Sequence, residues 1–200
     1  MLRVSAPIQV AVLIPVKAFG EAKNRLAPSL DATERAKLAR TMAAHVVSCA
    51  KPLPVAIVCD DPEVREWGLE AGAEVIWCPG TGLNGAVRSG VDHLRDAGIA
   101  QAIVSHGDLP LAGPLAPLGD WPGITLVPDH RNDGTNVIAL PCSNNFQFSY
   151  GHGSFRRHLA EAQQSRCSLR VLRDLSFGLD IDIPADLAKL AKTENHTDEH

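Results

Sequence analysis

Three aspartates stand where a divalent metal site would need them. Asp108 closes the apolar run in AQAIVSHGD, and Pro110 then ends regular strand pairing. Asp180 and Asp182 alternate in GLDIDIP, so an extended backbone would point both carboxylates to one face. The D-x-D pair alone is more typical of a solvated strand face. Together with Asp108 it predicts an oxygen-ligand set suited to Mg²⁺ or Mn²⁺.

A cluster of cations follows the first apolar run of the chain. The segment IPVKAFGEAKNRLAP, residues 14–28, contains Lys17, Lys23 and Arg25, although the chain carries a formal net charge of −4. Such a loop either faces water or holds an anion, and the acids elsewhere in the chain favour the second interpretation. Cations combined with metal-binding acids indicate phosphoryl or nucleotidyl transfer, which depends on positioning and charge neutralisation.

Covalent catalysis by a protein nucleophile has little support in the sequence. The chain has no G-x-S-x-G elbow and no convincing order of Ser, His and Asp. His106 lies beside a glycine at an expected strand end, and we predict a structural or loop role for it.

A glycine-rich segment, GTGLNG at residues 80–85, formally matches the G-x-G-x-x-G dinucleotide fingerprint. That fingerprint belongs to the first strand–helix turn of its unit, whereas this segment follows the third expected strand. We therefore interpret it as a nucleotide-contacting loop that opens a helix, with Gly82 and Asn84 as contact residues. The Asn84 side chain can both donate to and accept from a base edge.

A second loop of small residues lies further along the chain. Thr135 follows Gly134 at a turn, and Gly151, Gly153 and Ser154 form a loop of small residues at the start of the helical segment SFRRHLAEA. Backbone N–H groups, a hydroxyl and the positive end of a helix form an anion pocket. Ordinary N-capping by Ser154 is the structural alternative.

Strand-like and helical segments alternate over the first ~108 residues, as in an open, doubly wound α/β sheet. Ligands of such sheets collect at the carboxyl ends of the strands, so the cation loop, GTGLNG and Asp108 are expected at one edge. The expected strands are residues 8–14, 54–59, 73–78, 100–108, 123–129, 135–141, 169–174 and 178–184. The expected helices are residues 31–50, a segment beginning at Pro62 behind a cap at Asp61, and residues 84–98, 154–164 and 184–190.

Composition restricts the class of protein. A hydrophobic content of 45% with 21% charged residues predicts one globular domain, residues 1–192, followed by a polar, frayed or disordered tail at 193–200. The negative net charge argues against a nucleic-acid or membrane partner. Five cysteines without a C-x-x-C pair indicate reduced thiols. No membrane span or signal peptide is apparent, which predicts a cytoplasmic protein.

Six segments carry a resemblance to a known family: PVKAFGEAKNRLAP, GTGLNGAVRSG, SHGDLPL, DGTNVIAL, SYGHGSFRRHLAEA and LDIDIPADL. Over residues 10–190 the chain resembles the phospholactate/phosphoenolpyruvate guanylyltransferases, CofC and FbiD, of coenzyme F-420 biosynthesis. The resemblance implies a single-domain nucleotidyltransferase fold, Rossmann-like and similar to molybdenum-cofactor guanylyltransferases and GT-A enzymes, with a mostly parallel sheet flanked by helices. It also implies that GMP passes from GTP to a three-carbon phosphoacid and that pyrophosphate leaves.

The resemblance also implies roles for individual residues. The cations would hold the triphosphate of GTP: Lys17, Lys23 and Arg25. The acids would bind magnesium, with manganese as the other option: Asp108, Asp180 and Asp182. Three residues fall on positions that contact the phosphoacid in phosphoenolpyruvate-using members: Thr135, Gly151 and Ser154. The chain departs from the common pattern at Asn24, where serine is frequent, and at Asp182, where some members have glutamate.

Other functions stay open at this point. A nucleotide-sugar glycosyltransferase would share the sheet and the D-x-D pair but would not need the cation loop. A molybdenum-cofactor guanylyltransferase normally carries a G-G-x-S-x-R-M type first loop, which residues 15–28 lack. A non-catalytic regulator would bind GTP without turnover. The acceptor is phosphoenolpyruvate, 2-phospho-L-lactate or 3-phospho-D-glycerate; we favour the first because the Ala-, Gly- and Arg-rich composition is bacterial in character. A homodimer is compatible with the sequence.

Overall fold

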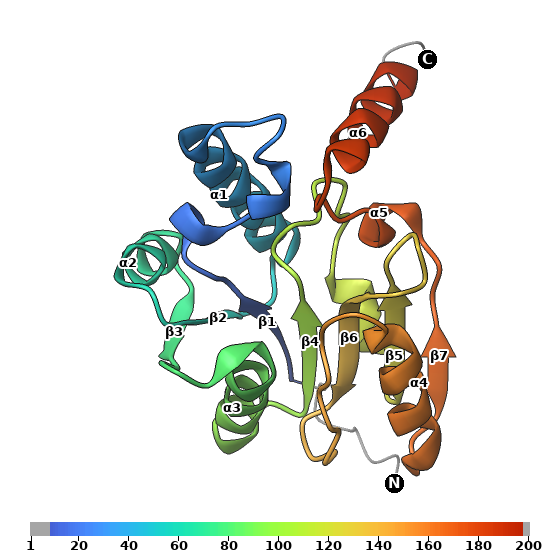
Figure 1. Cartoon of the computed structure of the whole chain (residues 1–200). Helices are drawn as coiled ribbons and strands as arrows, with labels where there is room; N and C mark the ends of the chain where they lie inside the picture. The colour runs from blue at the N-terminus through green and yellow to red at the C-terminus, as the bar shows by residue number, and fades with distance from the viewer. Residues whose placement is uncertain (1–8, 198–200) are drawn as a thin grey trace, which may run out of the picture.

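A single seven-stranded sheet forms the centre of the computed structural model, which describes residues 9–197 (Figure 1). The strands run in the order β3-β2-β1-β4-β6-β5-β7. All strand pairs are parallel except those that β6 makes with β4 and β5. The strands are β1 Val10–Pro15, β2 Val55–Cys59, β3 Glu74–Trp77, β4 Gln101–Ser105, β5 Ile124–Pro128, β6 Thr135–Pro141 and β7 Leu169–Val171. The expected mostly parallel α/β fold is confirmed.

Helices cover both faces of the sheet, which explains why its central strands are apolar throughout. On β1, Val12 and Ile14 pack with α1 and α2, whereas Ala11 and Leu13 pack with α3 and α4. A strand covered on both faces reads as a continuous hydrophobic run. The α-helices are α1 Ala32–Cys49, α2 Pro62–Glu70, α3 Gly82–Asp96, α4 Ser154–Gln164, α5 Leu175–Gly178 and α6 Pro184–Thr197. Short 3₁₀ turns are η1 Phe19–Glu21, η2 Asn24–Leu26 and η3 Ala116–Asp120.

Local signals in the sequence begin the first two helices where we expected them. The Asp31 side chain accepts from the backbone N–H of Glu34 and the Glu34 side chain accepts from that of Asp31, which makes a full capping box at α1. The Asp61 side chain caps α2 by accepting from the Val64 N–H alone, and Pro62 occupies the first turn. These contacts satisfy backbone donors that a helix leaves free at its start.

The sheet topology brings distant segments to one edge. Because β1 and β4 are parallel neighbours, with Leu13 opposite Val104, the loops that follow them emerge side by side. Strand β6 runs the other way, so its first residues lie beside the end of β4; the His106 N–H donates to the Asn136 carbonyl. Thr135 therefore reaches the same edge as the cation loop and Asp108.

The chain departs from the sequence prediction near its C-terminus. Residues 178–184 do not form the expected strand, because the backbone N–H groups of Asp182 and Ile183 donate to the Asp186 side chain, both at 2.9 Å. A four-residue helix, α5, precedes this segment. Helix α6 continues beyond the expected 184–190 to Thr197, since no proline or glycine interrupts it after Pro184, and it extends away from the body (Figure 1). Of the expected tail 193–200, residues 198–200 lie outside the described residues.

Two predictions from composition can also be compared with the structure. All five cysteines are free thiols, and Cys59, Cys78 and Cys142 are buried. Within residues 9–197, no helix combines the length and the apolar character that a membrane crossing requires.

We expect Gly123→Ala to destabilise the fold by about 1–3 kcal/mol, the usual cost of overpacking. A Cβ at this position would lie 2.1 Å from the Ser168 carbonyl oxygen, which accepts the hydrogen bond from Ile124 that begins the β5–β7 pairing. A backbone atom cannot move aside as a side-chain end can. The measurement is the free energy of unfolding by urea.

The matched control is Gly113→Ala, where a Cβ would meet no atom within 4 Å. It should leave the free energy of unfolding within about 0.5 kcal/mol of the wild type. Equal effects of the two substitutions would contradict the description of the β5–β7 edge.

Candidate functional site

Cations from the first loop and acids from two distant segments meet at the carboxyl edge of the sheet. The Lys23 ammonium nitrogen lies 2.5 Å from Asp108 Oδ2 and 3.2 Å from Asp182 Oδ1, across 85 and 159 positions of the chain. Arg25 Nη1 donates to Asp182 Oδ2 at 3.3 Å. The Lys23 side chain is only 8% exposed. The structure thus joins the two charged groups that the sequence placed far apart.

Backbone geometry directs each of these side chains to the same point. Lys23 adopts a left-handed conformation, with φ of 58°, between η1 and η2. Such a conformation is uncommon for a residue with a Cβ and often marks a functional position. The Asp108 carbonyl accepts from Ile181 N–H at 3.4 Å, which ties the end of β4 to the segment that carries Asp180 and Asp182.

Asp186 fixes this D-x-D segment through hydrogen bonds to its backbone. Its side chain is almost fully buried and accepts from the N–H groups of Asp182 and Ile183. It also forms an ion pair with Arg131. Asp186 was not among the residues predicted for the site. An acid two positions after Pro184, at the start of a helix, is the signal that could have revealed it.

Burial and neighbouring charges shift the pKa values of the ionisable groups in the site. Burial works against ionisation of both Lys23 and Asp108, but their mutual attraction outweighs it: the pKa of Lys23 is raised and that of Asp108 is lowered. Among residues 9–197, Asp180 has no ion pair with a lysine or arginine; the basic side chain beside it is His130, whose Nδ1 lies 3.8 Å from Asp180 Oδ1. Burial, followed by the charge of Asp108, raises the pKa of Asp180, and Asp129 and Asp182 add to that effect.

Two buried carboxylate oxygens of the site accept no hydrogen bond from any residue between 9 and 197. They are Asp108 Oδ1 and Asp180 Oδ1. Within residues 9–197 no three His, Cys, Asp or Glu side chains are already arranged around a common metal position, and the Lys23 ammonium lies between Asp108 and Asp182. Unsatisfied carboxylate oxygens at a concentration of negative charge fit a divalent cation of the Mg²⁺ or Mn²⁺ type.

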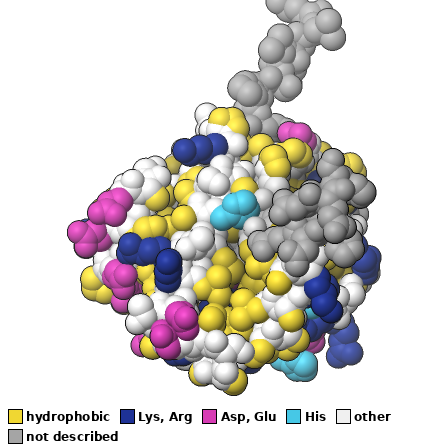
Figure 2. Space-filling model, turned by 90° about the horizontal axis from the view of Figure 1, so that it is seen from above, with side chains coloured by type: hydrophobic (Ala, Val, Ile, Leu, Met, Phe, Trp, Pro, Cys, Tyr) yellow, Lys and Arg dark blue, Asp and Glu magenta, His cyan; other side chains and the backbone are white. Residues whose placement is uncertain are grey.

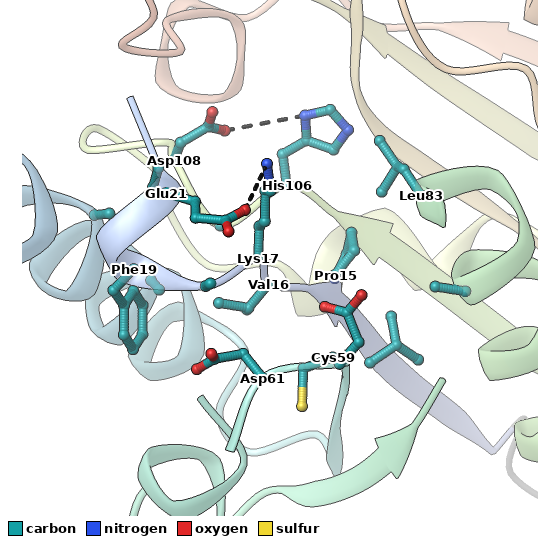
Figure 3. A pocket seen from close by; sticks show the side chains of 18 of the residues that line it. Pro15, Val16, Lys17, Phe19, Glu21, Cys59, Asp61, Leu83, His106 and Asp108 are labelled. Carbon is teal, nitrogen blue, oxygen red and sulfur yellow. Dashed lines mark ion pairs between the residues drawn. The ribbon is translucent and has the colours of Figure 1, made fainter. Parts of the chain in front are cut away.

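Two adjoining cavities open around these acids. The larger, of about 600 Å³, is lined by Lys17, Lys23 and the start of α3 at Gly82 (Figure 3). The smaller, of about 330 Å³, contains all three predicted phosphoacid positions and Asp180. Both cavities share four lining residues: Leu83, His106, Asp108 and Asp182. The acids therefore stand at the junction of one continuous cleft. Seen from above, this face shows a central histidine with Lys and Arg side chains around it (Figure 2).

The remaining cations lie closer to solvent than Lys23. Lys17 pairs with Glu21 at 3.3 Å, and both side chains are about two-thirds exposed (Figure 3). Lys17 lines the larger cavity, and within residues 9–197 it forms no ion pair with Asp108 or Asp182. Arg25 is 76% exposed and lines the smaller cavity.

The GTGLNG segment, predicted to contact a nucleotide through Gly82 and Asn84, differs in detail from that prediction. Gly82 begins α3 with φ of 62° and lines the larger cavity, where the helix N-terminus favours an anion. The Asn84 oxygen is already engaged, since it accepts from Tyr150 N–H at 2.7 Å. Asn84 therefore fastens α3 to the segment that leads into the smaller cavity, and it lines neither cavity itself.

The three predicted phosphoacid residues lie together in the smaller cavity: Thr135, Gly151 and Ser154. The capping alternative for Ser154 is wrong, because the N-cap of α4 is Gly153 with φ of 69° and Ser154 is the first helical residue. The Asp129 side chain shapes the turn before Thr135 by accepting from Arg131, Asp133 and Gly134 N–H groups.

Sequence reasoning missed Tyr150 and His158 and predicted only a structural or loop role for His106. His106 lines both cavities, its Nδ1 is 4.0 Å from Asp108 Oδ1, and its buried Nε2 has no hydrogen-bond partner in the described part of the chain. Its position two residues before Asp108 was a usable signal. His158 lies one helical turn after Ser154 on α4, which places both on one face. Tyr150 lines the smaller cavity without any sequence pattern that marks it.

Comparison with known proteins places the chain among nucleotidyl-transferring proteins. The sequence profile of the family described as "Guanylyl transferase CofC like" matches residues 10–199. The chain belongs to this family. The phosphoenolpyruvate guanylyltransferase of Sphaerobacter thermophilus is 35% identical to it over 189 residues, which cover 90% of this chain and 91% of that protein.

More distant relatives of this CofC-like chain agree on the fold. The 2-phospho-L-lactate guanylyltransferase of Methanocaldococcus sp. is 29% identical over 185 residues, 90% of this chain and 80% of that protein. A crystal structure of a putative nucleotide-diphospho-sugar transferase from Desulfovibrio desulfuricans G20 superposes with a TM-score of 0.76 at 15% identity. The superposition covers 92% of this chain and 87% of the other, and it supports the fold alone.

In metal-free protein, Asn substitutions of the two acids of the D-x-D segment, Asp180 and Asp182, should change the free energy of unfolding in opposite directions. Asp180→Asn should raise the free energy of unfolding at neutral pH, on the order of 1 kcal/mol, because it removes a buried charge whose oxygen has no partner. Asp182→Asn should lower it, since Asp182 carries ion pairs with Lys23 and Arg25. Urea denaturation in the presence of EDTA measures both.

The pH dependence follows from the sign of the pKa shift. A carboxyl with a raised folded pKa costs stability when ionised, and that cost disappears as the pH falls below the folded pKa. The difference between Asp180→Asn and wild type should therefore be present at neutral pH and vanish under acidic conditions. A destabilised Asp180→Asn variant at neutral pH would contradict this electrostatic description.

Proposed function

We propose that this chain transfers GMP from GTP to the phosphate of a small three-carbon phosphoacid and releases pyrophosphate, as a step of coenzyme F-420 biosynthesis. One observation carries the proposal: Lys23, Asp108 and Asp182 meet at the junction of two cavities, one larger and one smaller. A nucleotide in the larger cavity and a phosphoacid in the smaller would bring their phosphates together at these acids. Membership of the CofC-like family supports guanylyl transfer as the reaction.

The larger cavity suits a nucleoside triphosphate. Its cations, Lys17 and Lys23, come from the loop after β1, and the N-terminus of α3 adds the positive end of a helix. Leu83 lines the cavity with an exposed apolar side chain, which offers a surface for a flat base. We assign the triphosphate to Lys17, Lys23 and Arg25, and the nucleoside side to the loop around Gly82.

The smaller cavity suits a compact anion. Thr135 and Ser154 supply hydroxyls, and Gly151 lines the cavity just before the N-terminus of α4, where the helix dipole favours an anion. The higher identity to a relative named for phosphoenolpyruvate, 35% against 29% for one named for 2-phospho-L-lactate, favours phosphoenolpyruvate as the acceptor.

The reaction needs little proton chemistry from the protein. An oxygen of the acceptor phosphate bonds to the α-phosphorus of GTP, and the bond from that phosphorus to the pyrophosphate oxygen breaks. The attacking oxygen is already anionic at neutral pH, so no general base is required. A divalent cation, Mg²⁺ or Mn²⁺, held by Asp108, Asp180 and Asp182 would neutralise phosphate charge on both substrates.

In this scheme Lys23 pairs first with carboxylates of the site and then with the triphosphate. In the free protein its ammonium pairs with Asp108 and Asp182 and limits their repulsion. With substrates bound, it turns toward the triphosphate, where its charge stabilises the pyrophosphate that leaves. Lys17, which lines the larger cavity, and Arg25, which pairs with Asp182 at the junction of the cavities, add to that stabilisation.

The decisive assay measures pyrophosphate release with GTP, Mg²⁺ and each candidate acid. We expect phosphoenolpyruvate to be the best acceptor and ATP to be a poor replacement for GTP. Asp108→Asn should lower kcat/KM by at least about a hundredfold, the size of effect seen when one transition-state contact is removed. The matched control is Asp92→Asn on α3, because Asp92 pairs with Arg95 outside both cavities; it should retain wild-type activity.

Two outcomes would contradict the proposed function. GTP binding without pyrophosphate release with any of the three acids would favour the non-catalytic regulator. Undiminished turnover in Asp108→Asn would remove the acids from the reaction.

A further inference from the structure

His158 on α4 is fully buried, and each of its ring nitrogens has its own partner. Nε2 lies 2.9 Å from the backbone nitrogen of Ser149, and Nδ1 lies 3.0 Å from Thr135 Oγ1. A backbone N–H can only donate, so Nε2 must accept and carry no proton. The neutral ring then holds its proton on Nδ1 and donates it to the Thr135 oxygen.

This contact determines what the Thr135 hydroxyl can do. Its oxygen already accepts one hydrogen bond from His158, so its own hydrogen turns away from the ring and remains available to donate. Thr135 is 1% exposed yet lines the smaller cavity. A donor held in one direction before the ligand arrives loses little entropy on binding.

Tyr150 provides an independent sign that this wall of the cavity awaits a ligand. Its hydroxyl is buried and has no hydrogen-bond partner within residues 9–197, and the residue lines the smaller cavity. Burial raises the pKa of Tyr150, so the phenol keeps its proton and can only gain by donating it. The Tyr150 and His158 rings pack edge to face with centroids 4.9 Å apart. The rings thereby support one another's orientation.

We propose that His158 is a positioning residue of the phosphoacid site: as a neutral imidazole with its proton on Nδ1, it fixes the Thr135 hydroxyl as a hydrogen-bond donor to the anionic acceptor. The inference rests on the proposed function, because that function supplies the anion. It assigns His158 an action through Thr135 and no contact with substrate. A protonated ring that binds the anion directly would place an N–H against the N–H of Ser149.

The surroundings of His158 keep the ring neutral. Burial, with the charges of Arg157 and His106 as smaller causes, lowers the pKa of His158 to about 4. The ring therefore keeps one proton, on Nδ1, throughout the neutral range. The same burial holds the ring between Tyr150 and Phe146, which prevents it from rotating away from Thr135.

Two substitutions at position 158 separate the two ring contacts. The amide of asparagine lies near the place of Nδ1, so His158→Asn can still donate to Thr135. The amide of glutamine reaches the place of Nε2, so His158→Gln can still accept from Ser149 but offers no donor to Thr135. We expect His158→Gln to raise KM for phosphoenolpyruvate about tenfold, the loss expected for one hydrogen bond to a charged group. KM for GTP should not change, and His158→Asn should remain closer to wild type.

The combination with Thr135→Val tests whether His158 acts through Thr135. The single substitution Thr135→Val should also raise KM for phosphoenolpyruvate about tenfold, and the double variant Thr135→Val/His158→Gln should be no worse than either single one. The inference would be overturned if the double variant multiplied the two single increases in KM for phosphoenolpyruvate, or if His158→Gln left that KM unchanged. The proposed function would survive either result as long as the wild type turns over. Absence of turnover in the wild type would instead count against the proposed function.

A spectroscopic measurement decides the tautomer without any substitution. Long-range ¹H–¹⁵N correlation spectra of histidine-labelled wild-type protein at pH 7 should show the His158 ring with its proton on Nδ1; nuclear Overhauser contacts of this ring with the Phe146 and Tyr150 rings assign the signal. A proton on Nε2, or on both nitrogens, would overturn the inference even if the variants fail to fold.

Discussion

The site depends on one ammonium group, that of Lys23, placed among carboxylates that repel one another. Asp108, Asp180 and Asp182 come from two segments of the chain and meet where burial weakens solvation. Lys23 pairs with two of them, and the third keeps a raised pKa and an oxygen without a partner. Like charges held close at a cavity store electrostatic energy that a divalent cation with its phosphates can relieve. The fold tolerates this arrangement because the helices bury an extensive apolar core on both faces of the sheet.

The sheet explains why these groups meet at one edge. Parallel β1 and β4 deliver the cation loop and Asp108 side by side, and antiparallel β6 returns its first residue, Thr135, to the same place. The Asp186 side chain accepts hydrogen bonds from the backbone of the D-x-D segment. The Ile181 N–H donates to the Asp108 carbonyl, which holds this segment against the end of β4. The larger cavity is lined mainly by the first half of the chain and the smaller mainly by the second, and both share Asp108 and Asp182.

Much of this could be predicted from the sequence because its causes are local. The apolar run of β1, the capping box at Asp31 and the Asp61–Pro62 helix start each depend on neighbouring residues alone. The segment around Asp180 was misassigned as a strand because the backbone N–H groups of Asp182 and Ile183 bond to the Asp186 side chain, four and three positions along the chain, where a strand would bond to a neighbouring strand. The engagement of the Asn84 oxygen by Tyr150, and the contact between His158 and Thr135, join residues far apart in the chain. The sequence named the charged residues of the site but not the buried groups that orient them.

A crystal structure with Mn²⁺ and a non-hydrolysable GTP analogue, with anomalous scattering to locate the manganese, tests the central claim most directly. The account predicts an anomalous peak bound by Asp108, Asp180 and Asp182, with the Lys23 ammonium moved from Asp108 to the triphosphate. Manganese bound elsewhere, or a triphosphate that leaves the Lys23 pairs with Asp108 and Asp182 intact, would contradict it.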